Sequence, residues 1–204
     1  MPANRYCLKD GTLVPGVTTI INQLNKPQLL DWAWKLGKEG KDWREERDSA
    51  GDIGTLVHEL ILGFLSGKST NLKDRNDAVR KCFGKFVNWW INEKPNNPEI
   101  IVEKPFISEK LKFGGQPDLY IVDNKKLCDM KTSNGIYESY WLQLAGYDIL
   151  LRENGYKVDE YQILWLPKDD RFDCPIKTDL RRERAIFKHL LGIYKLRNDR
   201  NNVP

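Results

Sequence analysis

The spacing of apolar residues divides the chain into a helical first part and a second part rich in strands. In two long stretches apolar side chains recur every three or four residues, as at Val57, Ile61 and Phe64. This period predicts amphipathic helices over residues 49–67 and 78–94. Three further elements are expected nearer the start: a small hairpin from residues 5–8 and 13–14, a short helix over 19–24 capped by Thr18, and a helix that Pro27 opens.

Beyond residue 98 the apolar residues fall in short runs bounded by turn-forming residues. Such runs are typical of β-strands. Three strands in a meander are predicted over residues 100–108, 112–122 and 126–132, followed by a helix over 136–153. Two more strands are predicted over 160–167 and 172–177, and a closing helix starts at Asp179. The sequence thus predicts an α/β fold of the mixed α+β kind, with a central mixed sheet of about five strands flanked by helices.

Length and composition agree with one globular unit. The chain has 204 residues, of which 40% are apolar and 30% are charged. No Gly/Ser-rich or Pro-rich linker divides it. We therefore expect a single domain over residues 1–204, with a mainly helical part at 1–98, a sheet core at 99–177, and a closing helix and tail at 178–204.

The sequence argues against a membrane-spanning protein and against a secreted one. No apolar run approaches the roughly 20 residues that span a bilayer, and the first residues lack the apolar segment of a signal peptide. We expect a soluble cytoplasmic protein without a membrane partner. The net charge of +4 permits a nucleic-acid partner without requiring one. The four cysteines form no CxxC pair, so they indicate neither a zinc site nor a disulfide framework.

Two acidic residues and a lysine lie on adjacent extended runs. The segment between Asp118 and Asp129 is typical of a strand, a turn and a second strand, so the hairpin would fold the two acids toward each other. Lys131, two residues after Asp129, would share its strand face. Two carboxylates favour Mg²⁺ or Mn²⁺, and this arrangement suits hydrolysis of a phosphodiester. A surface hairpin with ordinary solvated charges is the alternative.

Five short motifs follow one another along the chain. They are Gly54-x-x-x-His58, Glu103, Gly115-x-x-Asp118, Asp129-x-Lys131 with Thr132-Ser133 after it, and Gln143-x-x-x-Tyr147. Each motif is weak alone, but the ordered set on suitable helices and strands is specific. In these motifs the chain resembles RecB-like members of the PD-(D/E)XK nuclease superfamily. Residues 14–20 and 30–33 further resemble phage exonucleases and the mitochondrial genome maintenance exonuclease.

The resemblance implies a restriction-endonuclease-like core and a divalent metal, Mg²⁺ or Mn²⁺. The implied metal ligands are His58, Asp118, Asp129 and the backbone carbonyl of Met130. Lys131 would position or deprotonate the attacking water and stabilise the developing negative charge. Glu103 would hold a second metal or a water. From the residues alone, a half-buried structural histidine and a solvated strand glutamate stay open for His58 and Glu103.

Further residues are implied in contacts with DNA. Gln143 and Tyr147 are four apart on a predicted helix and therefore face one direction. By resemblance that direction is the active site, where Thr132 and Ser133 would donate hydrogen bonds to phosphate oxygens. Trp34, in charged surroundings, is a candidate for stacking on a base. Core packing stays open for Tyr147, and a surface side chain without a functional role stays open for Gln143.

The motifs together predict a metal-dependent DNA exonuclease that hydrolyses phosphodiester bonds from DNA ends. We expect it to act on single-stranded or flapped DNA in phage-type replication, recombination or repair, in a bacterium or a phage-infected cell. An endonuclease of the same fold and a non-catalytic DNA-binding module are the alternatives. A recombinase or a single-strand-binding protein is the expected protein partner. Some relatives hold an iron-sulfur cluster with a late cysteine trio that this chain lacks, so we expect no such cluster.

Overall fold

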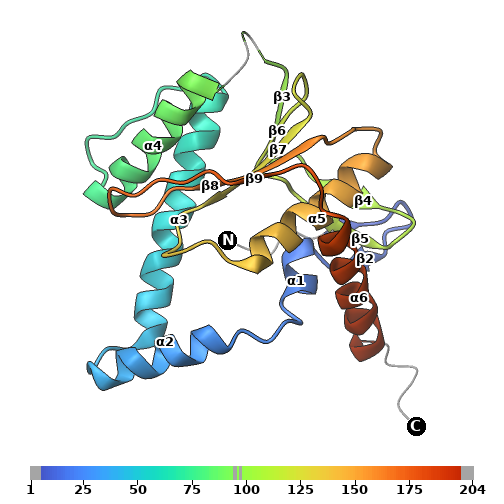
Figure 1. Cartoon of the computed structure of the whole chain (residues 1–204), viewed down its shortest axis with the longest axis horizontal. Coiled ribbons are helices and arrows are strands. Elements are labelled where there is room, and N and C mark those ends of the chain that lie inside the picture. The colour runs from blue at the N-terminus through green and yellow to red at the C-terminus, as the bar shows by residue number, and fades with distance from the viewer. Residues whose placement is uncertain (1–5, 94–95, 97, 199–204) are drawn as a thin grey trace.

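A five-stranded mixed sheet with helices on both faces forms the centre of the molecule (Figure 1). The computed structural model describes residues 6–93, 96 and 98–198. The sheet has the order β3-β6-β7-β8-β9, in which β7 and β8 run parallel and the other neighbours antiparallel. Its strands are β3 (Ile100–Val102), β6 (Leu119–Ile121), β7 (Lys126–Lys131), β8 (Glu160–Trp165) and β9 (Ile176–Lys177). The predicted fold class is confirmed.

The meander predicted ahead of the long fifth helix is divided into shorter strands. Here β4 (Phe106–Ser108) and β5 (Phe113–Gly115) pair with each other in a separate hairpin. The backbone turns at Glu103, whose φ of 44° lies in the left-handed region. Pro105 and Pro117 lack the N–H that a strand ladder needs. The prediction of three continuous strands was therefore wrong.

The remaining elements are a small hairpin and the helices. They are β1 (Tyr6–Cys7), β2 (Leu13–Val14), α1 (Val17–Ile21), α2 (Pro27–Lys38), α3 (Trp43–Leu65), α4 (Asp77–Glu93), α5 (Glu138–Glu153) and α6 (Arg181–Asn198). The predicted hairpin is confirmed from residue 6, while Arg5, the predicted helix end at residue 94 and the tail from residue 199 lie outside the described residues. Within the described ranges, no helix is both long and apolar enough to cross a lipid bilayer.

Two predicted helix starts were wrong. Gly16, not Thr18, is the N-cap residue of α1, and no side chain caps that end. The third helix starts at Trp43, six residues before the predicted start. The side chain of Asp42 caps it by accepting a hydrogen bond of 2.7 Å from the backbone N of Arg44, and two glutamates in the first turn suit the positive end of the helix dipole.

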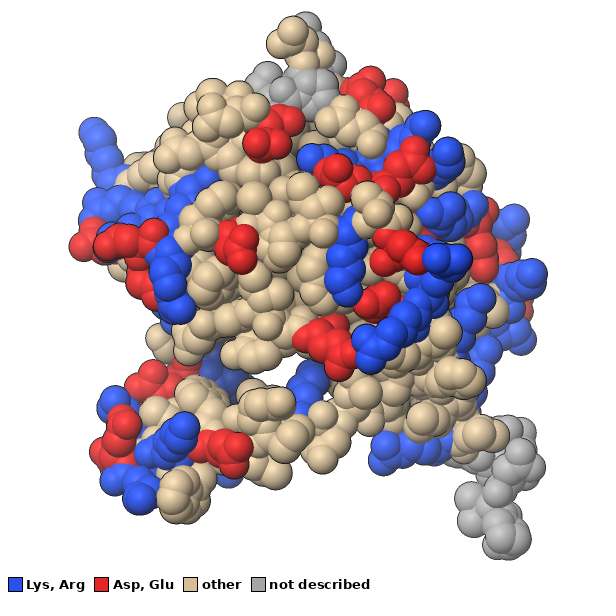
Figure 2. Space-filling view, in the orientation of Figure 1, with Lys and Arg blue, Asp and Glu red and all other residues tan. Residues whose placement is uncertain are grey.

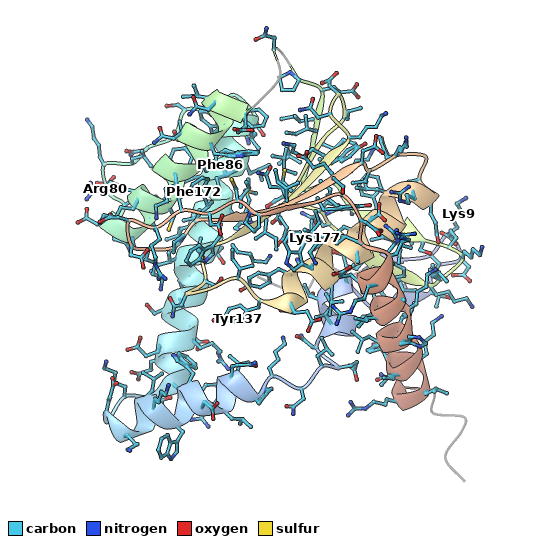
Figure 3. All side chains as sticks on the ribbon, in the orientation of Figure 1. Lys9, Arg80, Phe86, Tyr137, Phe172 and Lys177 are labelled. Atoms are coloured by element: carbon cyan, nitrogen blue, oxygen red, sulfur yellow. The ribbon has the colours of Figure 1, made fainter. Side chains whose placement is uncertain are left out.

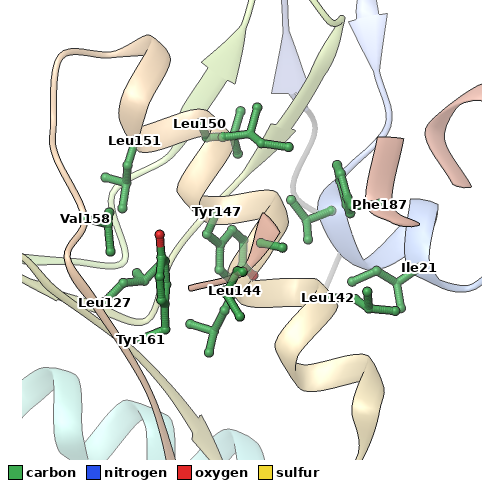
Figure 4. Packing of buried hydrophobic residues seen from close by; sticks show 14 of the residues in the cluster. Ile21, Leu127, Leu142, Leu144, Tyr147, Leu150, Leu151, Val158, Tyr161 and Phe187 are labelled. Carbon is green, nitrogen blue, oxygen red and sulfur yellow. The ribbon is translucent and has the colours of Figure 1, made fainter. Parts of the chain in front are cut away.

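Apolar side chains pack on both faces of the sheet. One cluster joins the sheet to α1, α5 and α6, and the other joins it to α3 and α4. Figure 4 shows part of the first cluster, with α5 contributing Tyr147 to its centre. Along β7, Leu127 belongs to the first cluster and Met130 to the second. Because side chains alternate along a strand, Asp129 and Lys131 point toward the α5 side.

Residues 27–53, which include α2 and the first half of α3, form an arm that stands away from the sheet (Figure 1). No residue of α2 is buried. Figure 2 shows an opening in the space-filled surface between α2 and the rest of the molecule. Trp34 lies on this arm with 64% of its surface exposed. Most side chains of the arm are therefore exposed to solvent, and Ile53 at its end packs against the cluster on α3 and α4.

Two adjacent glycines let tyrosines pack against the β4–β5 hairpin. A Cβ atom at Gly114 would lie 2.3 Å from Cγ of Tyr6, and one at Gly115 would lie 2.8 Å from Cε1 of Tyr147. Neither separation is tolerated between carbon atoms. The backbone N of Gly114 also donates a 2.9 Å hydrogen bond to the carbonyl of Pro15. The glycines thus fix the first hairpin and α5 close to the strand that precedes Asp118.

We expect Gly114→Ala to lower the free energy of unfolding by about 2 kcal/mol, because the added methyl group overpacks the site against Tyr6. Urea denaturation followed by circular dichroism measures the change. Gly84→Ala is the matched control, since Gly84 lies inside α4 with no atom within 4 Å of an added Cβ. It should stabilise the protein by up to about 1 kcal/mol. Equal effects of the two substitutions would contradict the packing role.

Candidate active site

The β6–β7 hairpin brings Asp118 and Asp129 together. The strands are antiparallel with Leu119 opposite Cys128, so Asp118, just before β6, lies beside Asp129 in β7. Oδ2 of Asp118 accepts a 2.8 Å hydrogen bond from the backbone N of Met130. The two side chains are 12% and 0% exposed, respectively. Two acids that are eleven positions apart in the sequence therefore lie side by side in a buried site.

Lys131 forms an ion pair with the more buried of the two acids. Its Nζ lies 2.7 Å from Oδ2 of Asp129, and its side chain is 17% exposed. Burial alone would lower the pKa of the Lys131 amine, but the carboxylates of Asp129 and Asp118 outweigh burial and raise the pKa above its ordinary value. The amine is therefore a fixed positive charge beside the two acids.

Asp129 has an incomplete set of partners. Burial raises its pKa to about 6, against the opposing effect of Lys131 and with a further increase from Asp118. Oδ2 pairs with Lys131, whereas Oδ1 is buried and has no hydrogen-bond partner in the described part of the chain. A buried carboxylate oxygen without a partner is costly. A cation at this oxygen would remove that cost.

His58, on α3, reaches the same place from the opposite side of the hairpin. Its Nε2 donates a 3.2 Å hydrogen bond to the carbonyl of Met130, and its Nδ1 lies 3.8 Å from Oδ1 of Asp118. Because a carbonyl can only accept, Nε2 carries a hydrogen, and in the neutral form of the ring the lone pair is on Nδ1. The ring therefore presents a ligand nitrogen toward Asp118.

These donors suit a hard divalent cation in kind, since they comprise carboxylate, imidazole and carbonyl groups. In the structure they contact protein groups, among them Lys131 and the backbone N of Met130. Across the described ranges, no three His, Cys, Asp or Glu side chains are gathered closely enough to hold a metal ion. Binding of a cation would therefore require the side chains to exchange protein partners for the ion. The unpartnered Oδ1 of Asp129 is the observation that favours such an exchange.

Glu103 directly follows β3, whereas the sequence placed it within a strand. Its positive φ is uncommon for a residue with a side chain. Its backbone N donates a 3.3 Å hydrogen bond to the carbonyl of Asp118, which holds the two residues side by side. Burial raises the pKa of its carboxyl, His58 opposes the increase, and Asp118 and Glu59 add to it. Glu103 thus lies at the border of the site.

Gln143 and Tyr147 form a hydrogen-bonded pair on α5. Nε2 of Gln143 donates to the Tyr147 hydroxyl at 2.9 Å. Tyr147 is 5% exposed, and burial first, then Asp118 and Asp129, raise its pKa well above the ordinary value. The ring therefore stays neutral and packs in the core while its hydroxyl lies within the electrostatic reach of both acids. The structure brings Tyr147 to the site without giving it a contact to Lys131.

The segment after β7 is tied to its neighbours. A Cβ at Gly54 would lie 3.2 Å from Oγ1 of Thr132, so the glycine lets α3 approach the end of β7. Oγ of Ser133 donates a 2.8 Å hydrogen bond to the carbonyl of Gly135, and the carbonyl of Ser133 accepts one of 2.7 Å from Nε1 of Trp165. Contacts of Thr132 and Ser133 with phosphate stay predictions.

Trp34 is not near the acids but on the arm. Nζ of Lys38 lies 4.4 Å from the centroid of its ring. Further along the arm, the guanidinium groups of Arg44 and Arg47 lie 4.9 and 5.2 Å from the ring of Trp43. Trp34 is exposed and Trp43 is partly buried. An exposed aromatic ring with a cation beside it is typical of surfaces that contact single-stranded nucleic acid.

Sequence reasoning missed Tyr140. Nζ of Lys131 lies 5.1 Å from the centroid of its ring. The ring packs edge-on against that of Tyr137, with centroids 5.5 Å apart and an interplanar angle of 81°. Figure 3 shows Tyr137 beside the first turn of α5. A signal was available, because Tyr140, Gln143 and Tyr147 are three and four residues apart and share one face of α5.

Comparison with known proteins gives structural matches only. No family model matches the chain, and no curated protein does. Chains of solved structures match in 22 cases. One is an exonuclease candidate from Eubacterium rectale, with 16% identity, a TM-score of 0.49, and coverage of 72% of this chain and 65% of that one. The chain thus spans less than two thirds of that protein.

Two other matches are named exonucleases. The alkaline exonuclease LHK-Exo from Laribacter hongkongensis has 14% identity and a TM-score of 0.44, over 71% of this chain and 78% of that one. A phage-related exonuclease from Haemophilus somnus has 15% identity and a TM-score of 0.38, over 68% and 77%. These names agree with the family resemblance that the motifs carry. The three matches described have identities below 25% and TM-scores below 0.5, so the activity is inferred from the residues of the site.

The burial of Asp129 gives a testable pH dependence of stability in EDTA. Folding raises its pKa from 3.8 to about 6, so the folded state binds the proton more tightly. This contribution is complete below the lower pKa and is lost as the pH rises through the higher one, by roughly 3 kcal/mol. Urea unfolding of wild type and Asp129→Asn measures it. The wild-type free energy of unfolding should fall relative to the variant between about pH 4 and pH 6.

The control for this measurement is Asp170→Asn, a surface carboxylate whose side chain is 92% exposed. Its difference from wild type should change little over the same range. A wild-type stability that rises relative to Asp129→Asn with increasing pH would contradict the raised pKa.

Proposed function

We propose that the chain is a metal-dependent DNA exonuclease that hydrolyses phosphodiester bonds from DNA ends. The observation that carries this proposal is the gathering of Asp118, Asp129 and Lys131 around a buried carboxylate oxygen that has no partner in the described residues. A non-catalytic DNA-binding module would have no use for two like charges held together at a cost in stability. The arrangement therefore favours an enzyme.

When bound, Mg²⁺ or Mn²⁺ would activate water and neutralise charge on the phosphate. Asp118, Asp129, His58 and the carbonyl of Met130 would hold the ion. Lys131 would orient the attacking water and stabilise the negative charge that develops on the phosphoryl oxygens. Because the carboxylates keep its pKa above the ordinary value, Lys131 acts here as a positive charge and not as a proton acceptor.

Hydrolysis adds one water across a P–O bond. The water oxygen bonds to phosphorus, and a hydrogen ends on the oxygen that leaves. Glu103, at the border of the site, would hold a second cation or a water. Gln143 lines a small cavity of about 110 Å³ together with Thr18 and Lys26, where donors would meet a backbone phosphate. Thr132 and Ser133 would extend these contacts.

Single-stranded or flapped DNA is the substrate that the arm suits best. Trp34 and Trp43 are aromatic surfaces with cations beside them, and base stacking does not depend on sequence. Figure 2 shows the opening between the arm and the body of the molecule. We place the enzyme in phage-type replication, recombination or repair in the cytoplasm of a bacterium or phage-infected cell, with a recombinase or single-strand-binding protein as partner. An endonuclease of the same fold is the second candidate.

Nuclease activity can be measured on end-labelled single-stranded DNA, linear duplex and covalently closed circles, with Mg²⁺, Mn²⁺ or EDTA. We expect the wild type to degrade linear DNA when metal is present and to spare circles. Asp118→Asn and Lys131→Ala should each slow the reaction at least about 100-fold, because each removes a charge that acts in the transition state. Asp118→Asn keeps an acceptor for the backbone N of Met130.

Asp170→Asn is the control carboxylate and should cleave like the wild type, since its side chain is 92% exposed and pairs with Lys81 of α4. Circular dichroism and thermal unfolding show whether each variant is folded. Cleavage of circles would indicate an endonuclease. Binding of DNA without turnover in any metal would overturn the enzyme assignment.

Metal binding has a readout that does not depend on activity. Mn²⁺ or Mg²⁺ should raise the melting temperature of the wild type, because a ligand that binds only the folded state stabilises it, by about 2.7 kcal/mol at 100 times the dissociation constant. Asp129→Asn should lose most of this shift. Differential scanning fluorimetry over a metal titration measures both, and equal shifts in the two proteins would contradict the proposed ligand.

A further inference from the structure

The ammonium group of Lys131 has two kinds of neighbour. Oδ2 of Asp129 lies 2.7 Å away, and the centroid of the Tyr140 ring lies 5.1 Å away. A cation within about 6 Å of an aromatic centroid is attracted by the electrons of the ring face, more strongly where water is excluded. The Lys131 side chain is only 17% exposed, so the contact with the ring is largely shielded from solvent.

The ring of Tyr140 is itself firmly held. It packs edge-on against Tyr137, and while burial raises the pKa of its hydroxyl, the nearby side chain of Ser133 opposes that increase. Ser133 is in turn fixed to β8, because its carbonyl accepts the 2.7 Å hydrogen bond from Nε1 of Trp165. These contacts connect the ring to both β8 and α5. Tyr140 therefore has a set position relative to the adjacent strand β7, which carries Lys131.

We propose that Tyr140 is a positioning residue for Lys131, an inference that rests on the proposed function. A lysine side chain is long and flexible, and a divalent cation taken up by Asp129 would compete with Lys131 for the same carboxylate. The ring carries no charge and its face is no ligand for a hard cation, so it keeps its attraction for the ammonium group when the carboxylate is engaged. The charge then stays beside the reacting phosphate.

The test compares Tyr140→Leu with Tyr140→Phe in steady-state cleavage of linear single-stranded DNA. Tyr140→Leu should lower kcat about 10- to 30-fold, the loss expected for one shielded cation–ring contact, while KM changes less than about threefold. Tyr140→Phe keeps the ring and should retain kcat within about threefold. Tyr194→Leu, on α6, is the control for the same change of side chain and should leave kcat unchanged. Thermal unfolding confirms that each variant is folded.

A double-mutant cycle separates positioning from a structural role. In a Lys131→Met background, Tyr140→Leu should slow the residual reaction less than about threefold, because its effect passes through Lys131. Affinity for a labelled single strand in EDTA should be unchanged. An equal loss in both backgrounds, or a wild-type kcat for Tyr140→Leu, overturns the positioning role while leaving the exonuclease assignment intact. A wild type without turnover overturns both.

Discussion

Two carboxylates held side by side in a buried position are the constraint on which the rest of the structure depends. Asp118 and Asp129 repel each other, and burial deprives them of water. The backbone N of Met130 and the ammonium group of Lys131 offset part of this cost. One oxygen of Asp129 still has no partner in the described residues. Such a site persists only where the surrounding protein prevents the acids from moving apart or turning to solvent.

The surrounding protein supplies that rigidity on both faces of the sheet. Two apolar clusters fix β7 between α5 and α3, and Gly115 lets Tyr147 pack directly behind the acids. Away from the site, buried Asp148 on α5 pairs with Arg152 at 2.7 Å and with Arg184 of α6 at 2.6 Å. This pairing ties the last helix to the one that carries Tyr147. Stability gained in such places offsets the cost of a strained functional site.

The parts of the fold that depend on local pattern could be predicted from the sequence. Alternation and turn residues predict the β6–β7 hairpin, and the motif spacing selects Asp118, Asp129 and Lys131. The separate β4–β5 hairpin was missed although Pro105 and Pro117 are visible in the sequence, whereas the positive φ of Glu103 has no signal in its residue type. The helix face that Tyr140 shares with Gln143 and Tyr147 was readable from the sequence, but its contact with Lys131 follows from how α5 packs on the sheet.

The aromatic side chains that pack around the charged residues of the site, Tyr147 and Tyr140, are themselves neutral. Burial first, and then nearby charges, raise the pKa of the Tyr147 hydroxyl well above its ordinary value, and burial also raises that of Tyr140. Another acid in their place would add repulsion, and another base would pair with the carboxylates and compete with any arriving cation. Neutral aromatic rings fix the geometry and leave the negative charge of Asp118 and Asp129 for a cation. The same choice of side chains thus serves both the fold and the proposed chemistry.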